Sequence, residues 1–515
     1  MRAIILAAGF GTRLKPLTLT KPKPLLEIRG VSLLENMITH LRHSGVEEII
    51  LVSGYKHELF APIVKAQGLT QLVFPDYGLC NSSQSLLFAK DYLCKGSIIL
   101  NGDLYITQGF CHLFKKNASQ FLAQKIPPNT SAWGYIVDEN YKILDIDTNA
   151  QEGYGDGIAY FDNERDLGHF INALQQCHKD EYWEQAVLDT LQEINYYAFF
   201  HDNLYTEIDS FSDALYHALL TPEEIAQQCA DDGKATRLAG ITNTNYLIHF
   251  NNTPQVIRIP GLHTEQVIDR DKEAKILDII APLGIAPKSR FYGSGIKMSD
   301  YLSDYKPLDF AQISDEILGQ IASKLLALHS IKHTSYPHFE PILLCDEIAK
   351  YEALAQIKLA TPQEHKRLTS IAKKLDTREL VLCHRDLQLP NILYNGKHIM
   401  LIDFEYAGFA CIEWELGNLA AELELSPSQI LTLLHAYNTS PRLITYEDVL
   451  CGALLANYIW ALWGWVYHRI DLGRMYLARF SRNLAELEEL ESSSSSLNQS
   501  PQRSGDDKRT YFCTK

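Results

Sequence analysis

Short apolar runs alternate with amphipathic stretches along the first part of the chain. The runs 2–8, 48–53 and 97–101 have the length of buried strands, and the stretches 32–44 and 82–92 repeat apolar residues at helical spacing. Strands that alternate with helices in this way predict an α/β fold with a parallel, doubly wound sheet. Such sheets bind ligands at the carboxyl ends of their strands, so the residues that follow each run are candidates for a site.

The second part of the chain shows a different pattern. Leu238–Phe250 predicts two strands joined by a turn, and Val256–Ile259 predicts a third. Helical patterns follow at 270–280, 313–329 and 345–358. A small sheet followed by a larger helical part predicts an α+β domain.

A polar and acidic segment, Thr221–Gly233, separates the two patterns, and we place the domain joint there. The predicted domains are residues 1–228 and 234–485. The remainder, 486–515, is acidic and then rich in serine, which predicts a disordered tail because such a composition cannot bury a core.

The composition is that of a protein that binds small molecules. The 515 residues carry a formal net charge of −16, which argues against general nucleic-acid binding. The ten cysteines are scattered without a CxxC pair, a pattern typical of reduced thiols in a cytoplasmic protein. The apolar run Val449–His468 contains Asn457 and lacks flanking basic clusters, which favours a buried helix over membrane insertion. The oligomeric state stays open.

The segment 382–405 carries the strongest chemical signal, LCHRDLQLPNILYNGKHIMLIDFE. Asp386 and Asn391 follow the pattern HRD-L-x-x-x-N, and Asp403 closes an apolar run. In this order Asp386 accepts or orients the proton of an attacking hydroxyl, while Asn391 and Asp403 hold Mg²⁺ on the nucleotide phosphates. The structural alternative is a polar loop before a buried strand that ends in aspartate by coincidence. The complete spacing favours phosphotransfer.

A glycine-rich turn follows the first apolar run, in the string LAAGFGTRLKPLTLTKPKPLL. Backbone N–H groups in such a turn can approach a phosphate chain closely. The string resembles the signature of nucleotidyltransferases that act on phosphorylated sugars and alcohols, whose fold is Rossmann-like, and it departs from the Walker pattern. The resemblance implies that Arg13 and Lys23 meet the β- and γ-phosphates of a triphosphate. The implied nucleotide-binding residues are Leu6, Ala8, Gly9, Gly11, Thr12, Asn81 and Ser85.

Two acids complete this first candidate site. Asp103 closely follows the run 97–101, and Asp209 lies in TEIDSFSD. Asp103 could instead be an ordinary turn residue without a ligand, because aspartate is common in turns. In the family these positions hold Mg²⁺ at the α-phosphate.

Aromatic residues and a carboxylate suggest the acceptor of this first site. Trp133, Tyr182, Trp183 and Glu207 resemble the phosphocholine-binding residues of bacterial CTP:phosphocholine cytidylyltransferases, and a quaternary ammonium binds to such groups. The aromatics could instead fill core space, and only one of Tyr182 and Trp183 need line the site.

The second part resembles choline and aminoglycoside kinases, which implies a bilobal, protein-kinase-like fold. Its expected nucleotide-covering loop contains Gly240, Thr242, Asn243 and Asn245. Arg258 stands where a lysine usually grips the phosphates, and Glu273 could pair with it. A salt-bridged surface pair is the alternative. Asp403-Phe-Glu405 replaces DFG, and Glu415 replaces the usual aspartate in a segment that supports the catalytic loop.

The same resemblance implies a choline pocket. Glu422 falls where choline kinases place an acid that faces the ammonium. Trp460 and Trp463 share one face of a helix, and Tyr476 precedes Leu-Ala-Arg-Phe as in the family. An apolar stripe at this spacing is more often core than cage. The family match favours the cage.

The two parts fit one pathway. The kinase part would phosphorylate choline with MgATP, and the nucleotidyltransferase part would convert phosphocholine and CTP to CDP-choline and pyrophosphate, with Mg²⁺ at both sites. The nearest rival is an amino-sugar kinase fused to a uridylyltransferase, and a rival of another class is a scaffold with a degenerate kinase fold. Ethanolamine remains open as a competing substrate.

Overall fold

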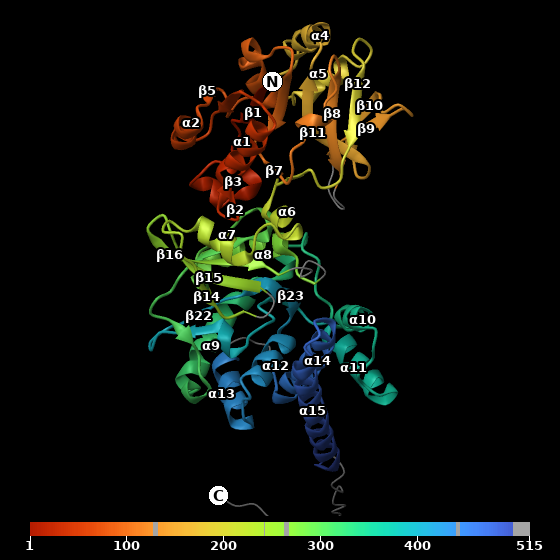
Figure 1. Ribbon diagram of the computed structural model, residues 1–515. Helices are drawn as coiled ribbons and strands as arrows, with labels where there is room; N and C mark the ends of the chain where they lie inside the picture. Colours follow the sequence, from red (N-terminus) through yellow and green to blue (C-terminus); the bar gives the residue numbers. More distant parts are fainter. Residues whose placement is uncertain (127–131, 241–242, 262–266, 439–442, 498–515) are drawn as a thin grey trace, which may run out of the picture. The chain divides into compact units, whose positions relative to one another are not determined.

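The computed structural model describes residues 1–126, 132–240, 243–261, 267–438 and 443–497 (Figure 1). The chain divides into two compact units. The first unit contains Met1–Leu262 and Arg290–Ser299, and the second contains His263–Ser289 and Asp300–Lys515.

A nine-stranded sheet forms the centre of the first unit. Its parallel part pairs β1 (Arg2–Ala7) with β4 (Glu48–Ser53) and with β6 (Ser97–Asn101), and β4 with β5 (Thr70–Val73). On the other side of β6 the sheet continues antiparallel through β11 (Tyr154–Phe161). The predicted α/β fold is therefore confirmed, and the strand ends converge on one edge.

The sequence of β1 explains why both faces of this sheet are covered. Ala3, Ile5 and Ala7 belong to one buried cluster, and Ile4 and Leu6 belong to another. Successive side chains of a strand point to opposite faces, so a continuous apolar run fits a strand between two layers.

The remaining elements of the nine-stranded sheet are β8 (Ser119–Lys125), β9 (Ala132–Val137), β10 (Ile143–Ala150) and β12 (Tyr196–Phe200). Helices α1 (Leu33–His43) and α4 (Glu164–Leu174) lie against it (Figure 1), and buried residues of α1, α3 (Ser82–Phe88) and α4 share clusters with its strands. A capping box of Ser32 and Glu35 begins α1, as its polar start and amphipathic pattern predict.

A second, five-stranded sheet also belongs to the first unit. Its order is β14 (Thr236–Leu238), β15 (Asn243–Phe250), β16 (Thr253–Pro260), β18 (Lys297–Asp300) and β17 (Ser289–Phe291). Ile225 of helix α7 (Pro222–Cys229) shares a buried cluster with Tyr246 and Ile248 of β15. The compact units therefore divide later than the predicted joint at Thr221–Gly233, because the apolar face of α7 attaches this sheet to the first unit.

The second unit is mainly helical. Short strand pairs join β20 (Leu380–Cys383) to β23 (Gly408–Cys411) and β21 (Ile392–Tyr394) to β22 (Ile399–Leu401). The helices are α8 (Arg270–Ile280), α9 (Asp315–His329), α10 (Leu344–Ala355), α11 (Pro362–Leu375), α12 (Ile412–Glu422), α13 (Pro427–Tyr437), α14 (Tyr446–Val466) and α15 (Ile470–Leu497).

Helix α14 is long and apolar enough to cross a membrane, yet 89% of its apolar window is buried within the protein. A side chain at Gly452 would lie 1.8 Å from the carbonyl oxygen of Glu413, so α14 approaches α12 at backbone distance. The helix is thus a core helix, as its sequence predicts.

The predicted tail begins too early. Helix α15 extends through Leu497, where Leu487 is buried and Arg367 of α11 pairs with Glu488 and Glu491. These contacts order a segment whose composition alone suggests disorder. Residues 498–515 lie outside the described part of the chain.

Candidate functional sites

The first site begins at the turn after β1. Gly11 has φ +61°, and a side chain there would lie 2.9 Å from Cβ of Lys23. Only glycine combines this left-handed backbone with so close an approach. The turn therefore brings the backbone at Gly11 beside Lys23.

Three acids and two cations meet at the edge of the sheet. Asp103 follows β6, and Glu207 ends strand β13 (Tyr205–Glu207). Carboxylate oxygens of Asp103, Glu207 and Asp209 all lie within 4.8 Å of one another. Nζ of Lys23 lies 2.8 Å from Asp103 and 2.8 Å from Asp209, and Arg13 lies 2.6 Å from the second oxygen of Asp209.

Electrostatics explains this arrangement. Burial opposes the charge of Lys23, but the carboxylates of Asp103 and Asp209 outweigh it and raise the pKa of the ammonium. Burial likewise opposes the charge of Asp209, yet Lys23 and Arg13 lower the pKa of its carboxyl. A group of carboxylate oxygens suits a hard cation such as Mg²⁺. The ammonium of Lys23 stands between the two carboxylates that such a cation would bind.

A cavity of about 610 Å³ opens beside these charges. Most residues predicted for the first site line it, namely Leu6, Ala8, Gly9, Gly11, Thr12, Arg13, Lys23, Asn81, Ser85, Asp103, Trp133, Tyr182, Glu207 and Asp209. Its walls also include Tyr77, Thr148 and Glu184, which sequence reasoning missed. Glu184 follows the two predicted aromatics directly, and that adjacency was the available signal.

Of the neighbouring aromatics Tyr182 and Trp183, only one lines this site, which is one of the alternatives that the sequence left open. Trp133 on β9 and Tyr182 both line the cavity, with ring centroids 6.3 Å apart at an angle of 73°. Trp183 does not line it. Its ring is buried and packs between Phe121 and Phe170, because neighbouring residues in this segment face opposite ways.

The second site lies around the loop that follows β20. The side-chain nitrogen of Asn391 donates hydrogen bonds of 2.9 Å to the carbonyl oxygen and to the carboxylate of Asp386. Gln388 donates to both carboxylate oxygens at 3.2 Å. Burial raises the pKa of Asp386, and the carboxylates of Asp403 and Glu422 raise it further. A carboxyl with this environment is suited to accept a proton.

Asp403 directly precedes a short helical turn, Phe404–Tyr406, and has the left-handed φ of 66°. Strained backbone of this kind persists where the surroundings fix it. The next acid, Glu405, is held by Arg270 of α8 at 2.9 Å, and the same guanidinium lies 3.1 Å from Glu273. Glu405 is therefore a buried, paired side chain rather than a solvated one.

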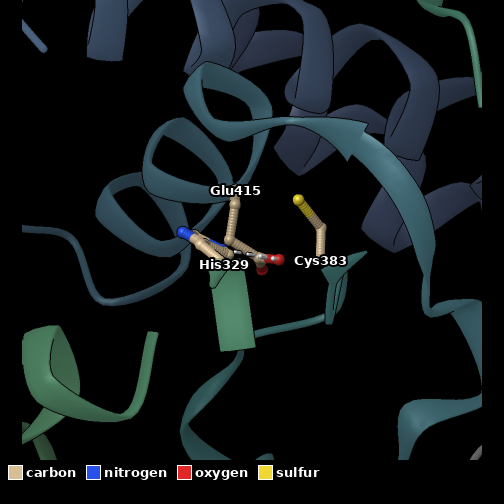
Figure 2. A group of neighbouring side chains, drawn as sticks. All are labelled: His329, Cys383 and Glu415. Carbon is tan, nitrogen blue, oxygen red and sulfur yellow. Dashed lines mark ion pairs between the residues drawn. The ribbon is translucent and has the colours of Figure 1, made fainter. Parts of the chain in front are cut away.

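A buried group of side chains contacts the loop that carries Asp386 (Figure 2). Figure 2 shows His329 of α9 and Glu415 of α12 side by side, with Cys383 of β20 near them. The carboxylate of Glu415 accepts hydrogen bonds from the backbone N–H groups of His384 and Arg385. Nε2 of His329 lies 3.9 Å from the same carboxylate. Glu415 thus fixes the backbone immediately before Asp386, as expected from the sequence.

The charge of Glu415 gives a prediction for acid stability. Burial opposes ionisation, but His329 and the loop N–H groups outweigh it and lower the pKa of Glu415. Such a carboxylate stabilises the fold above its unfolded pKa near 4.3, and this contribution is lost as the pH falls through the lower folded value. Glu415→Gln should cost about 2 kcal/mol or more at neutral pH. Urea denaturation should show the difference from wild type shrinking below about pH 4.3, and two parallel pH curves would contradict this.

Two tryptophans of α14 face an aromatic cluster. Nε1 of Trp460 donates to Asn418 at 2.8 Å, and Nε1 of Trp463 donates to the hydroxyl of Tyr406 at 2.9 Å. The ring centroid of Trp460 lies 5.2 Å from that of Tyr406 and 6.3 Å from that of Trp463. These bonds hold the rings edge to face, and both rings belong to a buried cluster with 7% of each residue exposed, so the choice between core and cage stays a prediction.

Helix α12 ends with an acid, Glu422. Burial raises the pKa of Glu422, which Arg479 partly offsets from 3.6 Å. Burial also raises the pKa of Tyr476, with a further contribution from Glu422. The carboxylate of Glu422 also raises the pKa of Asp386.

Of the predicted nucleotide-covering residues that the structure describes, Gly240, Asn243, Asn245 and Arg258 lie in the first unit, the last three on β15 and β16. A side chain at Gly240 would lie 2.6 Å from the carbonyl oxygen of Asn243, and Asn245 donates to the carbonyl of Ala239 at 3.1 Å. Arg258 is buried, with its guanidinium 5.7 Å from the ring centroid of Phe291.

Two predictions about nucleotide binding in this region stay predictions. Thr242 lies outside the described residues. The pairing of Arg258 with Glu273 joins residues of different units, each of which is described by itself.

Two family matches divide the chain between these sites. Residues 2–146 match the family described as Nucleotidyl transferase, and residues 236–439 match Choline/ethanolamine kinase. The chain belongs to both families. It is thus an enzyme that joins a domain of the nucleotidyl transferase family to a domain of the choline/ethanolamine kinase family, two families that use nucleotides, as the two sequence signatures indicate.

Individual relatives are each similar to one part of this nucleotidyl transferase–kinase chain. A choline-phosphate cytidylyltransferase of Streptococcus pneumoniae is 31% identical over 222 residues, 41% of this chain and 95% of the relative. A 2-aminoethylphosphonate cytidylyltransferase of Lancefieldella rimae is 31% identical over 202 residues, 38% of this chain and 81% of the relative. The crystal structure of choline kinase LicA from Streptococcus pneumoniae shares 26% identity, with a TM-score of 0.43, over 50% of this chain and 93% of that one.

Proposed function

We propose that this enzyme phosphorylates choline with ATP and then joins phosphocholine to CTP, releasing CDP-choline and pyrophosphate. One observation carries the proposal. In the first site Trp133, Tyr182 and Glu207 line one cavity, and in the second Trp460 packs against Trp463 while Glu422 acts on the pKa of Asp386. Aromatic faces with a nearby carboxylate recognise a quaternary ammonium, which cannot donate a hydrogen bond.

In the kinase site the choline hydroxyl attacks the γ-phosphorus of ATP. A bond forms from that oxygen to the γ-phosphorus, the bond to the bridging oxygen of ADP breaks, and Asp386 accepts the hydroxyl proton. Asn391 holds Asp386 through its two hydrogen bonds. Asn391 and Asp403 would hold Mg²⁺, which neutralises phosphate charge when bound.

In the nucleotidyltransferase site a phosphate oxygen of phosphocholine attacks the α-phosphorus of CTP. The bond to the β-phosphate breaks and pyrophosphate leaves, which Arg13 and Lys23 stabilise by charge. Asp103 and Asp209 would hold Mg²⁺ at the α-phosphate. The ammonium of Lys23 would then contact the pyrophosphate instead of the two carboxylates. Positioning and charge are sufficient for this step, without a covalent enzyme intermediate.

The acceptor of the first site has one specific rival. One relative is a 2-aminoethylphosphonate cytidylyltransferase, at the same identity as the choline-phosphate relative. The kinase part favours phosphocholine, because a kinase makes a phosphate ester of an alcohol and not a phosphonate. Sugar substrates would need many hydrogen-bonding side chains in place of the aromatic faces.

Phosphorus NMR tests the whole proposal. Purified protein is incubated with ATP, CTP, Mg²⁺ and choline, and phosphocholine should appear first and CDP-choline after it. A parallel reaction with CTP and added 2-aminoethylphosphonate measures the rival acceptor. Turnover of an amino sugar with UTP, and none with choline, would contradict the proposal, and complete inactivity would support a scaffold.

Trp463 should determine affinity for choline. Trp463→Leu keeps an apolar side chain but removes the ring, so the KM for choline should rise roughly 5- to 30-fold, the range expected for a desolvated cation–π contact. The KM for ethanolamine should rise less, since its ammonium can donate hydrogen bonds. Trp465→Leu is the matched control on the same helix, because its ring packs against Gly473 instead. An equal rise in KM for both alcohols would contradict a cage.

A further inference from the structure

A turn of the second sheet lies against the first site. The segment Gly293–Gly295, here called the β17–β18 turn, falls within the choline/ethanolamine kinase match but belongs to the first unit. The N–H of Tyr292 donates to the carbonyl of Ile296 at 2.8 Å and closes the turn. Ile296 shares a buried cluster with Leu14, which directly follows Arg13. The turn is thus anchored in the core that carries the glycine-rich loop.

Gly293 meets the backbone of Arg13. A side chain at Gly293 would lie 2.5 Å from the carbonyl oxygen of Arg13 and 3.4 Å from its Cα. Real Cβ atoms do not approach a backbone oxygen so closely, so glycine is required here for contact and not for its own backbone angles. The turn therefore packs against the backbone of Arg13, the residue that pairs with Asp209.

Ser294 meets the other half of that ion pair. It holds a left-handed backbone, with φ 59° and ψ 23°. Its Oγ accepts a hydrogen bond of 3.2 Å from the backbone N–H of Ser212. Ser212 lies in the first turn of α6 (Phe211–Tyr216), which begins just after Asp209. The same three-residue turn thus touches Arg13 on one side and the segment that carries Asp209 on the other.

We propose that the β17–β18 turn positions Arg13 and Asp209, so that residues of the kinase-family region complete the nucleotidyltransferase site. The inference rests on the proposed function of that site. Arg13 and Asp209 are themselves paired at 2.6 Å, and the turn contacts the chain on both sides of this pair. Gly293 and Ser294 are positioning residues, since they act through Arg13 and Asp209. A nucleotidyltransferase that lacked the second sheet would lack the contacts of Gly293 with Arg13 and of Ser294 with Ser212.

Three variants test the two contacts separately. Gly293→Ala adds one methyl group against Arg13. Ser294→Ala and Ser294→Gly both remove the acceptor for the Ser212 N–H, while only glycine relieves the left-handed backbone. Gly168→Ala is the matched control, because Gly168 lies exposed on α4 of the same unit with no atom within 4 Å of the added methyl group.

The measurement is steady-state kinetics of both activities in the full chain. For Gly293→Ala we expect kcat/KM for CTP to fall roughly 10- to 100-fold, the range of a misplacement near 1 Å, and for both Ser294 variants roughly 3- to 10-fold. The KM values for CTP and, in the reverse reaction, for pyrophosphate should rise, while the KM for phosphocholine and the choline kinase activity stay unchanged. A general structural defect would not separate these constants.

Other outcomes decide against the inference. Unchanged kinetics in all three variants, or an equal fall in both activities, would overturn it. Wild-type kinetics in Ser294→Gly alone would show that backbone strain, not the hydrogen bond, was at work, and would overturn the role of Ser294. If Gly293→Ala does not fold, the Ser294 pair carries the test. Inactivity of the wild-type protein with CTP and phosphocholine would contradict the proposed function instead, before any variant is measured.

Discussion

Asp386→Asn is expected to lower the rate of choline phosphorylation by roughly 10²- to 10⁴-fold, the range supplied by a positioned general base. The asparagine keeps the size of the side chain and its place beside Asn391 and Gln388, but it cannot take the hydroxyl proton. The reaction should slow through kcat, with the KM for choline little changed, because Trp460 and Glu422, the proposed ammonium-binding residues, are unaltered. Formation of phosphocholine from ATP and choline measures the effect.

The same variant should make CDP-choline at the wild-type rate when phosphocholine is added. This separates loss of chemistry from loss of folding, because the other activity of the same chain reports on the fold. Asp278→Asn is the matched control, since Asp278 lies exposed on α8 of the second unit. If the variant retains full kinase activity, Asp386 is not the proton acceptor. The hydrogen bonds of Gln388 and Asn391 to its carboxylate would then have only a structural role.

Much of this molecule could be predicted where a local pattern fixes a local geometry. The strand, turn and helix at residues 2–14 follow from an apolar run and two glycines, and the structure confirms the close approach that Gly11 allows. The HRD segment likewise specifies a loop between short strands. Family resemblance then supplied the chemistry, because composition and spacing alone do not distinguish choline from other alcohols.

The misplaced residues share a physical cause. Apolar spacing shows that Tyr182 and Trp183 differ in orientation, but only the packing partners Phe121 and Phe170 show that Trp183 faces the core. Helix α15 continues past residue 485, where the disordered tail was predicted to begin, and Arg367, distant in sequence, pairs with its glutamates. Long-range contacts of this kind leave no trace in a window of neighbouring residues.

The charge arrangement of the first site was also not readable from the sequence. Arg13 and Lys23 were expected to meet phosphates, and in the structure Lys23 pairs with Asp103 and Asp209 while Arg13 pairs with Asp209. This pairing avoids an unpaired buried charge, which would cost several kcal/mol. Binding of CTP with Mg²⁺ would then exchange one set of ion pairs for another, which keeps the site neutralised at both stages.

Asp209 stands at the centre of that exchange, and Asp209→Asn should lower kcat/KM for CTP by roughly 10²- to 10³-fold, comparable to the loss of one preorganised electrostatic contact in a transition state. The amide removes one negative charge that Lys23 and Arg13 share and weakens a predicted Mg²⁺ ligand. CDP-choline formation from CTP and phosphocholine measures the loss, while choline phosphorylation should be unaffected. Asp91→Asn, an exposed aspartate of the same unit, is the control.

A titration with Mg²⁺ separates the two roles of Asp209. If its carboxylate binds the metal, the Mg²⁺ concentration for half-maximal CDP-choline synthesis should rise in the variant, because a neutral amide is a weaker ligand for a hard cation than a carboxylate. If it serves only to hold Lys23 and Arg13, the rate falls with no change in the Mg²⁺ dependence. The second result would place the metal on Asp103 and Glu207, whose carboxylates lie within the same 4.8 Å group.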